Sequence, residues 1–123
     1  MRGALAGLPP GVHGIHFHQV GRCDPPDFTS AGPHLNPTQA LHGLQNPLGP
    51  HAGDLPNISV SAAGEASVDL VTPRVTPDVA SPRGVFGGDG TALVIHADPD
   101  DQATDPAGNS GARIACGVVT RGG

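Results

Sequence analysis

Glycine and proline occur so often along this chain that almost every window long enough for a helix contains one of them. The 123 residues include 19 glycines and 14 prolines, and both residue types disfavour helix interiors. No stretch of about eleven or more residues carries apolar side chains at the helical period. Charged residues make up only 14% of the chain, so the composition lacks the high charge of disordered chains. We therefore expect one compact all-β domain over residues 1–123.

Short segments with alternating apolar side chains indicate β-strands. The expected strands span residues 11–18, 58–60, 65–71, 91–96 and 112–119. The second and third of these, separated by a turn at Ala63 and Gly64, are expected to form a hairpin. The long stretches 19–55 and 97–111 lack such patterns, and loops of this length in a small domain are functional or disordered. Because the first stretch contains three histidines, a cysteine and several aspartates, the functional interpretation is favoured.

Charge and hydropathy exclude two classes of partner. The formal net charge is −5, which argues against the basic surface of a nucleic-acid-binding protein. The longest apolar runs are far shorter than the roughly 20 residues that a membrane-spanning helix requires, so we expect no membrane segment. Residues 1–8 also lack the charged stretch and long apolar run of a secretory signal peptide.

The two cysteines, Cys23 and Cys116, can be free thiols, a disulfide or metal ligands. Because neither has a second cysteine close in sequence, a zinc site built on cysteine pairs is disfavoured. We favour a disulfide. It would close a loop that contains most of the chain, and it would imply an oxidising compartment.

Seven histidines are the most informative feature for function, at positions 13, 16, 18, 34, 42, 51 and 96. His16 and His18 are two residues apart on an expected strand, so both rings project from one face and can bind the same metal. His13 lies on the opposite face and is expected to be structural. Neutral imidazoles suit copper and zinc. Three further histidines and an aspartate in the long loop form a plausible tetrahedral zinc set: His34, His42, His51 and Asp54.

Four blocks of sequence carry a family resemblance. They are Gly-Val-His-Gly-Ile-His-Phe-His at residues 11–18, Ser-Ala-Gly-Pro-His-Leu-Asn-Pro at 30–37, His-Ala-Gly-Asp-Leu at 51–55 and Gly-Ala-Arg-Ile-Ala-Cys-Gly-Val at 111–118. In this order they resemble copper/zinc superoxide dismutase, and the resemblance extends over residues 3–119. It implies an immunoglobulin-like Greek-key β-barrel with two long functional loops. It also implies conversion of superoxide to dioxygen and hydrogen peroxide.

The resemblance implies a role for each candidate residue. The copper ligands would be His16, His18, His34 and His96. The zinc ligands would be His34, His42, His51 and Asp54, so that His34 is shared. Asp100 would link a copper histidine to a zinc histidine, with Asp98 and Asp101 as alternatives. Arg113 would attract superoxide to the copper, and Cys23 and Cys116 would form the family's disulfide. His34 would pick up a proton during the copper cycle and deliver it to the second superoxide.

Relative to the family, the sequence begins near the end of the third strand, so the first two strands have no counterpart. We expect either a truncated sequence or a natural short form that a second copy or a strand-donating partner completes. The position of Cys23 resembles the bacterial secreted branch, which favours a periplasmic or extracellular location over a cytoplasmic one. Two competing hypotheses stay open: a non-catalytic module that binds metal or a partner, and a zinc-stabilised protein that never binds copper.

Overall fold

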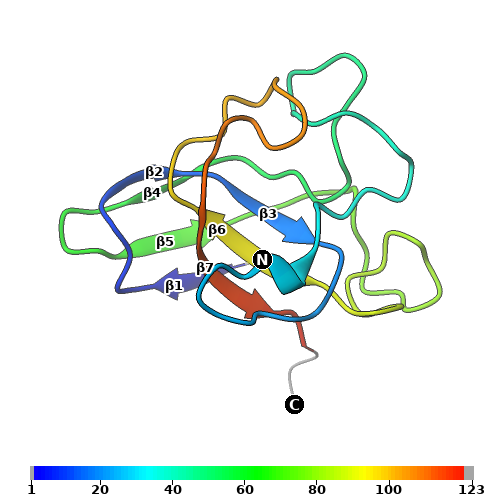
Figure 1. Ribbon diagram of the computed structural model, residues 1–123, viewed down its shortest axis with the longest axis horizontal. Helices are drawn as coiled ribbons and strands as arrows, with labels where there is room; N and C mark the ends of the chain where they lie inside the picture. Colours follow the sequence, from blue (N-terminus) through cyan, green and yellow to red (C-terminus); the bar gives the residue numbers. More distant parts are fainter. Residues whose placement is uncertain (1, 121–123) are drawn as a thin grey trace.

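Seven short β-strands and one 3-10 turn form the regular structure of the computed structural model, which describes residues 2–120 (Figure 1). The elements are β1 (Arg2–Leu5), β2 (Gly11–His13), β3 (Ile15–His18), the 3-10 turn η1 (Thr29–Ala31), β4 (Ile58–Val60), β5 (Ala66–Asp69), β6 (Ala92–His96) and β7 (Arg113–Val118). No α-helix occurs within residues 2–120, as the frequency of glycine and proline predicts. The same residues contain no helix with the length and hydropathy needed to cross a membrane.

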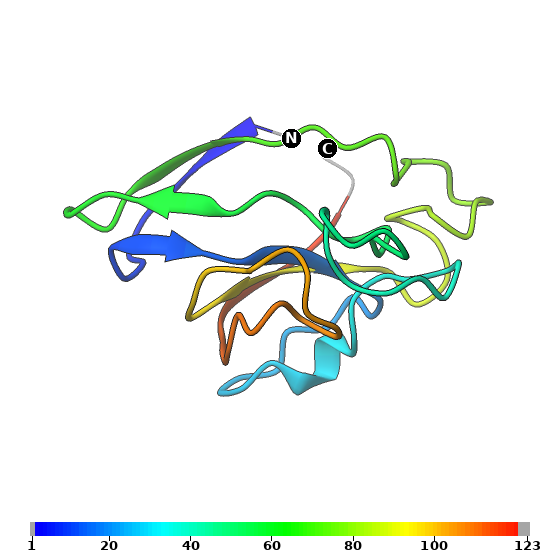
Figure 2. The same ribbon diagram turned by 90° about the horizontal axis from the view of Figure 1, so that it is seen from above.

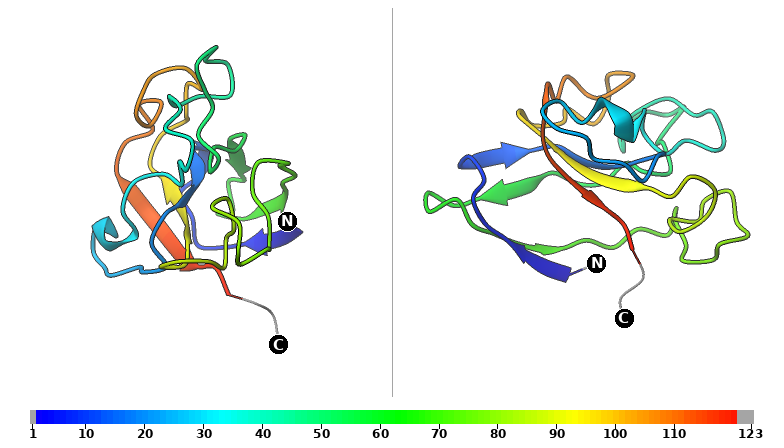
Figure 3. Two further views of the ribbon diagram at one scale, coloured as in Figure 1. Left: turned by 90° about the vertical axis from the view of Figure 1, so that its right-hand side faces the viewer. Right: turned by 60° about the horizontal axis from the view of Figure 1, so that its bottom comes forward.

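The strands pair only in antiparallel fashion and lie in two layers (Figures 2 and 3). β6 is the central strand of a three-stranded sheet in the order β3-β6-β7, while β1 pairs with β5 and β2 pairs with β4. Within the larger sheet, Ile15 of β3 is opposite Ile95 of β6. On the other side of β6, His96 is opposite Arg113, after a shift in register that follows Ile95. This pairing brings the expected histidine strand beside the strand that ends at His96.

Aliphatic side chains fill the space between the layers. The largest buried cluster includes Ile15 and Phe17 from β3, Ile58 from β4, Val68 from β5 and Ile95 from β6. Because side chains alternate along a strand, Ala92 and Val94 of β6 point to the other face, where they pack with Ala31 and the two cysteines. The loop that carries Ala31 thus covers the outer face of β6. Both faces of β6 are buried, which explains why this strand is almost entirely apolar in sequence.

Three sequence expectations about the strands need correction. The turn at Ala63 and Gly64 exists, but β4 and β5 on either side of it pair with β2 and β1 rather than with each other. The single expected strand 11–18 is interrupted at Gly14, where the main chain accepts a bond from the N–H of His96 and donates one to the carbonyl of Asp98. A Cβ at this position would lie 2.9 Å from Cβ of Ser110, so only glycine allows this close approach. Residues 70–91 form a third long irregular segment, in addition to the two that were expected.

Two loops carry most of the polar candidate residues, and the second half of the longer one lies beside the shorter one above the strands β3 and β6 (Figure 1). They are residues 19–57 and 97–112. Main-chain and side-chain bonds join them: Gln45 N–H donates to the carbonyl of Gln102 over 2.9 Å, and His42 N–H donates to Oδ1 of Asp105 over 2.8 Å. The loops therefore have a defined position although neither contains a strand.

Candidate metal centre

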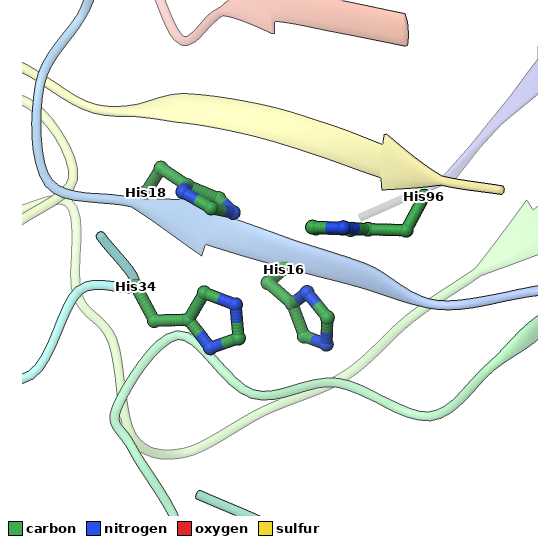
Figure 4. A group of neighbouring side chains, drawn as sticks. All are labelled: His16, His18, His34 and His96. Carbon is green, nitrogen blue, oxygen red and sulfur yellow. The ribbon is translucent and has the colours of Figure 1, made fainter. Parts of the chain in front are cut away.

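Four histidines from three parts of the chain gather beside β3 (Figure 4). His16 and His18 project from the same face of β3, and His96 is the last residue of β6. The ring centroid of His96 is 4.7 Å from that of His16 and 5.6 Å from that of His18. His34 belongs to the long loop, and its main chain forms an isolated β-bridge with His18. Its ring stacks on that of His16, with the two ring centroids 4.0 Å apart. All four rings are buried, and one nitrogen from each lies within 4.8 Å of the others.

Each of the three strand histidines has one ring nitrogen bound and the other unpaired. Nε2 of His16 is 2.6 Å from the carboxylate of Asp100, Nδ1 of His18 is 2.7 Å from the carbonyl of Gly32, and Nδ1 of His96 is 3.1 Å from the carbonyl of Gly111. Their other nitrogens, Nδ1 of His16 and Nε2 of His18 and His96, are buried without a hydrogen-bond partner. A buried polar atom without a partner is costly. Its lone pair is available for a metal, and outer bonds of this kind orient metal-binding histidines.

A second group of ligand atoms surrounds Oδ1 of Asp54. This oxygen is 2.9 Å from Nδ1 of His42, 3.3 Å from Nδ1 of His34 and 3.5 Å from Nδ1 of His51. Nδ1 of His34 is 3.1 Å from Nδ1 of His51. A tetrahedral zinc ion with bonds of about 2.0 to 2.1 Å holds its ligand atoms roughly 3.3 Å apart. These four separations, from 2.9 to 3.5 Å, therefore fit a zinc ion.

His34 and His16 lie at the junction of the two groups. Nδ1 of His34 faces Asp54 and His51, while its ring also packs against His16 and His18. His16 is close enough to His34, His42 and Asp54 that these four form a second set of ligand atoms within 4.8 Å of one another. The structure thus brings together all seven residues of the two expected ligand sets, with His34 positioned between them.

Asp100 links the two groups of ligands by contacting one histidine of each. Its carboxylate is 2.6 Å from Nε2 of His16 and 2.9 Å from Nε2 of His42. The two alternatives for this position lie elsewhere, since Asp101 is exposed and binds Thr104, and Asp98 lies against Gly111. Gly108 is needed at this point because a Cβ on it would collide with the Asp100 carboxylate, and its φ of +64° favours glycine. The aspartate that the sequence favours is therefore the one that contacts both histidines.

The metal-site residues have strongly shifted pKa values. Burial lowers the pKa of His16 to about 3, that of His18 to about 2 and that of His96 to about 4. Burial likewise lowers the pKa of His34. Neutral rings are the form that binds metals, so the four rings of His16, His18, His34 and His96 are prepared for ligation at neutral pH.

His42 and its two carboxylates shift in the opposite sense. Burial alone would lower the pKa of His42, but hydrogen bonds to Asp100 and Asp54 outweigh it and raise the pKa to about 9. Burial would raise the pKa of Asp54, yet bonds from His34, His42, His51 and the N–H of Gly43 hold it far below its usual range. The carboxylate is thus ionised, which favours a divalent cation beside it.

These shifts predict a pH optimum for the stability of the metal-free, disulfide-bonded protein. An unfolded histidine titrates near pH 6.5, whereas folded His96 and His16 take up protons only near pH 4 and 3. Their stabilising contribution is therefore complete above pH 6.5 and is lost as pH falls, at up to about 1.4 kcal/mol per pH unit for each ring. His42 contributes stability below pH 6.5 that is lost as pH rises through about 9.

We therefore expect the urea midpoint of the metal-free protein to be highest close to pH 6.5 and to fall more steeply on the acid side, where several rings act together. Equilibrium unfolding at pH 5, 6.5 and 8.5 measures this. A midpoint that stays constant or rises from pH 6.5 to pH 5 would contradict the prediction.

Arg113 lies at the edge of a cavity of about 540 Å³ that leads to the four-histidine group. It is the first residue of β7 and stands opposite His96 in the sheet, and its Nη1 donates to the carbonyl of Phe28 over 2.9 Å. His18, His34 and His96 line the same cavity. The guanidinium is therefore a fixed positive group on the open side of the histidine cluster.

The two cysteines form a disulfide, Cys23–Cys116, with a sequence separation of 93 residues. It connects β7 to the loop that carries Phe28 and Gly32, whose carbonyls hold Arg113 and His18. His13 is buried outside the metal groups, with its ring nitrogens 2.8 Å from the carbonyl of His96 and 2.7 Å from that of Pro9.

Three residues that contact the site escaped the sequence analysis. Asn57 exchanges two hydrogen bonds of 2.9 Å with the main chain of Asp100. Gln102 donates its side-chain amide to the carbonyl of Leu55 over 3.0 Å, and Arg74 donates to the carbonyl of Asp54 over 2.9 Å. All three side chains form hydrogen bonds with main-chain groups, and such bonds do not require a particular residue spacing that could be recognised in the sequence.

Comparison with known proteins identifies the family. The family model described as copper/zinc superoxide dismutase (SODC) matches residues 1–119. The chain is 53% identical over 113 residues to Cu-Zn superoxide dismutase 1 of Aquifex aeolicus, covering 91% of this chain and 67% of that protein. It is 46% identical over 117 residues to the Cu-Zn superoxide dismutase of Caulobacter vibrioides, covering 94% of this chain and 67% of that protein.

A solved structure agrees with these matches. The crystal structure of a SOD-like protein from Bacillus subtilis superposes with a TM-score of 0.90 at 42% identity, covering 97% of this chain and 80% of the other. This likeness confirms the expected all-β fold. Since both the sequence and the arrangement of strands match over almost the whole length, the chain belongs to the copper/zinc superoxide dismutase family.

Proposed function

We propose that the protein catalyses the dismutation of superoxide, with copper bound by His16, His18, His34 and His96 and zinc bound by His34, His42, His51 and Asp54. The observation that carries the proposal is the set of buried, unpaired ring nitrogens on His16, His18 and His96, each on a ring held from behind. Neutral nitrogen donors suit copper. The tetrahedral spacing around Asp54 supports zinc in the second group.

The chemistry transfers one electron between two superoxide ions. The first ion gives up an electron and becomes dioxygen, and the second takes up that electron and two protons and becomes hydrogen peroxide. When bound, copper would supply the one-electron couple for this exchange, and zinc would not change its oxidation state. His34 would hold one of the protons on Nε2, since its Nδ1 faces the zinc group. The ring therefore stays in place to donate this proton to the second substrate ion.

Arg113 would bind and orient the superoxide anion. The formal charge of the chain is −5, so the overall field repels an anion and attraction must be local. A positive group in a cleft can raise association rates by roughly 10 to 1000 fold. An incoming anion can meet the guanidinium, because Arg113 lines the cavity that opens to the histidine group.

Arg113→Ala is expected to lower the rate constant for superoxide at low ionic strength by roughly 10-fold or more while leaving the bound copper unchanged. The exposed Arg83, on the irregular segment 70–91, provides a control of equal charge, and Arg83→Ala should leave the rate unchanged. Stopped-flow decay of superoxide together with metal analysis measures both quantities. An unchanged rate in Arg113→Ala would contradict the role of this arginine.

Native mass spectrometry of the protein after addition of zinc and then copper tests the metal assignment and the oligomeric state together, and a dismutation assay follows on the same sample. One copper and one zinc per chain with rapid dismutation is the expected result. Zinc without copper would support a structural zinc protein instead. Full loading with both metals but no dismutation would support a non-catalytic module.

A non-catalytic module that binds metal or a partner is the second candidate, and one observation favours the binding of a partner. An apolar cavity of about 550 Å³ lies between β1 and β7 and is lined by residues such as Leu5, Leu93, Val118 and Val119. In the described residues β1 pairs only with β5 and β7 only with β6, so each has a free edge on this side. Free edges invite pairing with another strand. We propose that a second copy or a strand-donating partner covers this face, which the native mass spectrum would show as a complex.

The disulfide supports a location outside the reducing cytoplasm. Disulfides persist in the periplasm and in extracellular space, where thiol reductants are scarce. We therefore propose a periplasmic or extracellular location. Alkylation of free thiols in intact cells, before and after reduction, would distinguish an oxidised from a reduced pair.

A further inference from the structure

One side chain of the irregular segment 70–91 reaches the metal centre, although the proposed function gives this segment no role. Nη2 of Arg74 donates to the main-chain carbonyl of Asp54 over 2.9 Å. Nε of the same guanidinium is buried and makes no hydrogen bond within the described residues. The side chain as a whole is half-buried, and burial of Nε without a partner costs free energy that the bond to Asp54 helps to offset.

The carboxylate of Asp54 is oriented by main-chain donors. Its Oδ2 accepts bonds of 2.9 Å from the N–H groups of Gly43 and His51, and this leaves Oδ1 facing the histidines. The distance from Oδ1 to each histidine nitrogen also depends on where the main chain at position 54 lies. Side chains from two separate segments bind successive carbonyls there: Arg74 binds that of Asp54, and Gln102 binds that of Leu55 over 3.0 Å.

We infer that Arg74 is a positioning residue for the zinc-side carboxylate: its bond to the carbonyl of Asp54 sets the distance from Oδ1 to the histidine nitrogens. The inference rests on the proposed zinc role of Asp54. Metal geometry is sensitive to shifts of about 0.5 Å, and loss of an outer hydrogen bond typically weakens metal binding by roughly 10 to 100 fold.

The sign of the effect separates positioning from charge. The guanidinium is positive and therefore repels a divalent cation in the same region. If charge were its main effect, removal of Arg74 would slow the release of metal. If positioning is its main effect, removal speeds release. A lysine at this position keeps the charge and can still donate a hydrogen bond, so it tests whether a hydrogen bond is sufficient.

The experiment uses Co²⁺ as a probe of the zinc group, in the disulfide-bonded full chain. The variants are Arg74→Met, which keeps the apolar stem without a donor, Arg74→Lys, and Arg83→Met as a control on the same segment. We expect Arg74→Met to release Co²⁺ to a chelator roughly 10-fold faster than the parent, with a shifted visible absorption band of tetrahedral Co²⁺. Arg74→Lys should recover part of the loss, and Arg83→Met should behave as the parent.

Three results would overturn the inference. The first is an unchanged band and release rate in Arg74→Met. If the metal-free variant then also unfolds at a lower temperature, Arg74 has only a structural role. Slower release would assign the effect to charge. Failure of the parent chain to give a tetrahedral Co²⁺ spectrum would refute the zinc assignment itself, so the two failures can be told apart.

Discussion

Dismutation by the His34→Gln variant is expected to be at least roughly 100-fold slower than by the parent protein, in the range lost when a positioned proton donor is removed. His34 is the residue common to both proposed ligand sets, and its ring contacts His16 and His18 on one side and Asp54 on the other. Glutamine is similar in size but does not offer two opposed ring nitrogens. The variant should therefore lose the coupling between the two groups and the proton held on Nε2.

His51→Gln is the matched control for this experiment, because His51 belongs only to the zinc group. We expect it to lower the zinc content while copper stays bound. Metal analysis and superoxide decay on both variants separate the two effects. The assignment of His34 would be wrong if His34→Gln, with copper and zinc at the parent's level, kept the parent's rate.

Removal of the disulfide is expected to produce the largest loss of stability. The double variant Cys23→Ser, Cys116→Ser opens a loop with a sequence separation of 93 residues, and the chain-entropy model assigns roughly 4 to 5 kcal/mol to a closure of this length. Many single domains have only about 5 to 15 kcal/mol in total. The double variant should therefore unfold at a much lower urea concentration than the oxidised parent.

The reduced parent protein is the control for the disulfide variant, since it removes the bond without changing the residues. Both should unfold at the same urea concentration. A difference of less than about 1 kcal/mol between oxidised and reduced parent would mean that the reduced unfolded chain keeps compact structure, which the entropy model does not include. The disulfide and Arg113 tie the loop that carries Phe28 and Gly32 to β7, so activity of the reduced protein should also fall.

Local patterns predicted the strands well where one side of a strand faces the core. The alternation in residues 15–18 predicted that His16 and His18 share one face, and the structure confirms this, with Ile15 and Phe17 on the opposite face in the core. The apolar run 92–96 became the central strand β6. The expected hairpin failed because alternation specifies which face is buried but not which neighbour pairs with a strand. β4 and β5 instead find partners that precede them in the chain.

The identities of the candidate ligands could be predicted from the sequence, whereas their supports could not. Histidine spacing and family resemblance selected the seven residues that the structure places in two adjoining groups. Asn57, Gln102 and Arg74 were missed because each holds a main-chain group. Many polar side chains of suitable length can make such a bond, so the sequence contains no pattern of residue type and spacing from which the bond could be predicted.

The sequence by itself determined the absence of α-helices from residues 2–120, the all-β class, the two faces of the histidine strand and the residue types available to bind metal. These follow from local physics: glycine and proline disfavour helices, side chains alternate along a strand, and imidazole is a metal ligand. Only the tertiary structure decided that one ring nitrogen of each strand histidine is hydrogen-bonded while the other is unpaired. It also decided that Asp100, rather than Asp98 or Asp101, joins His16 to His42, and that Arg74 reaches the main chain of Asp54. Those contacts join residues far apart in the chain, and their distances depend on how the loops pack over the sheet.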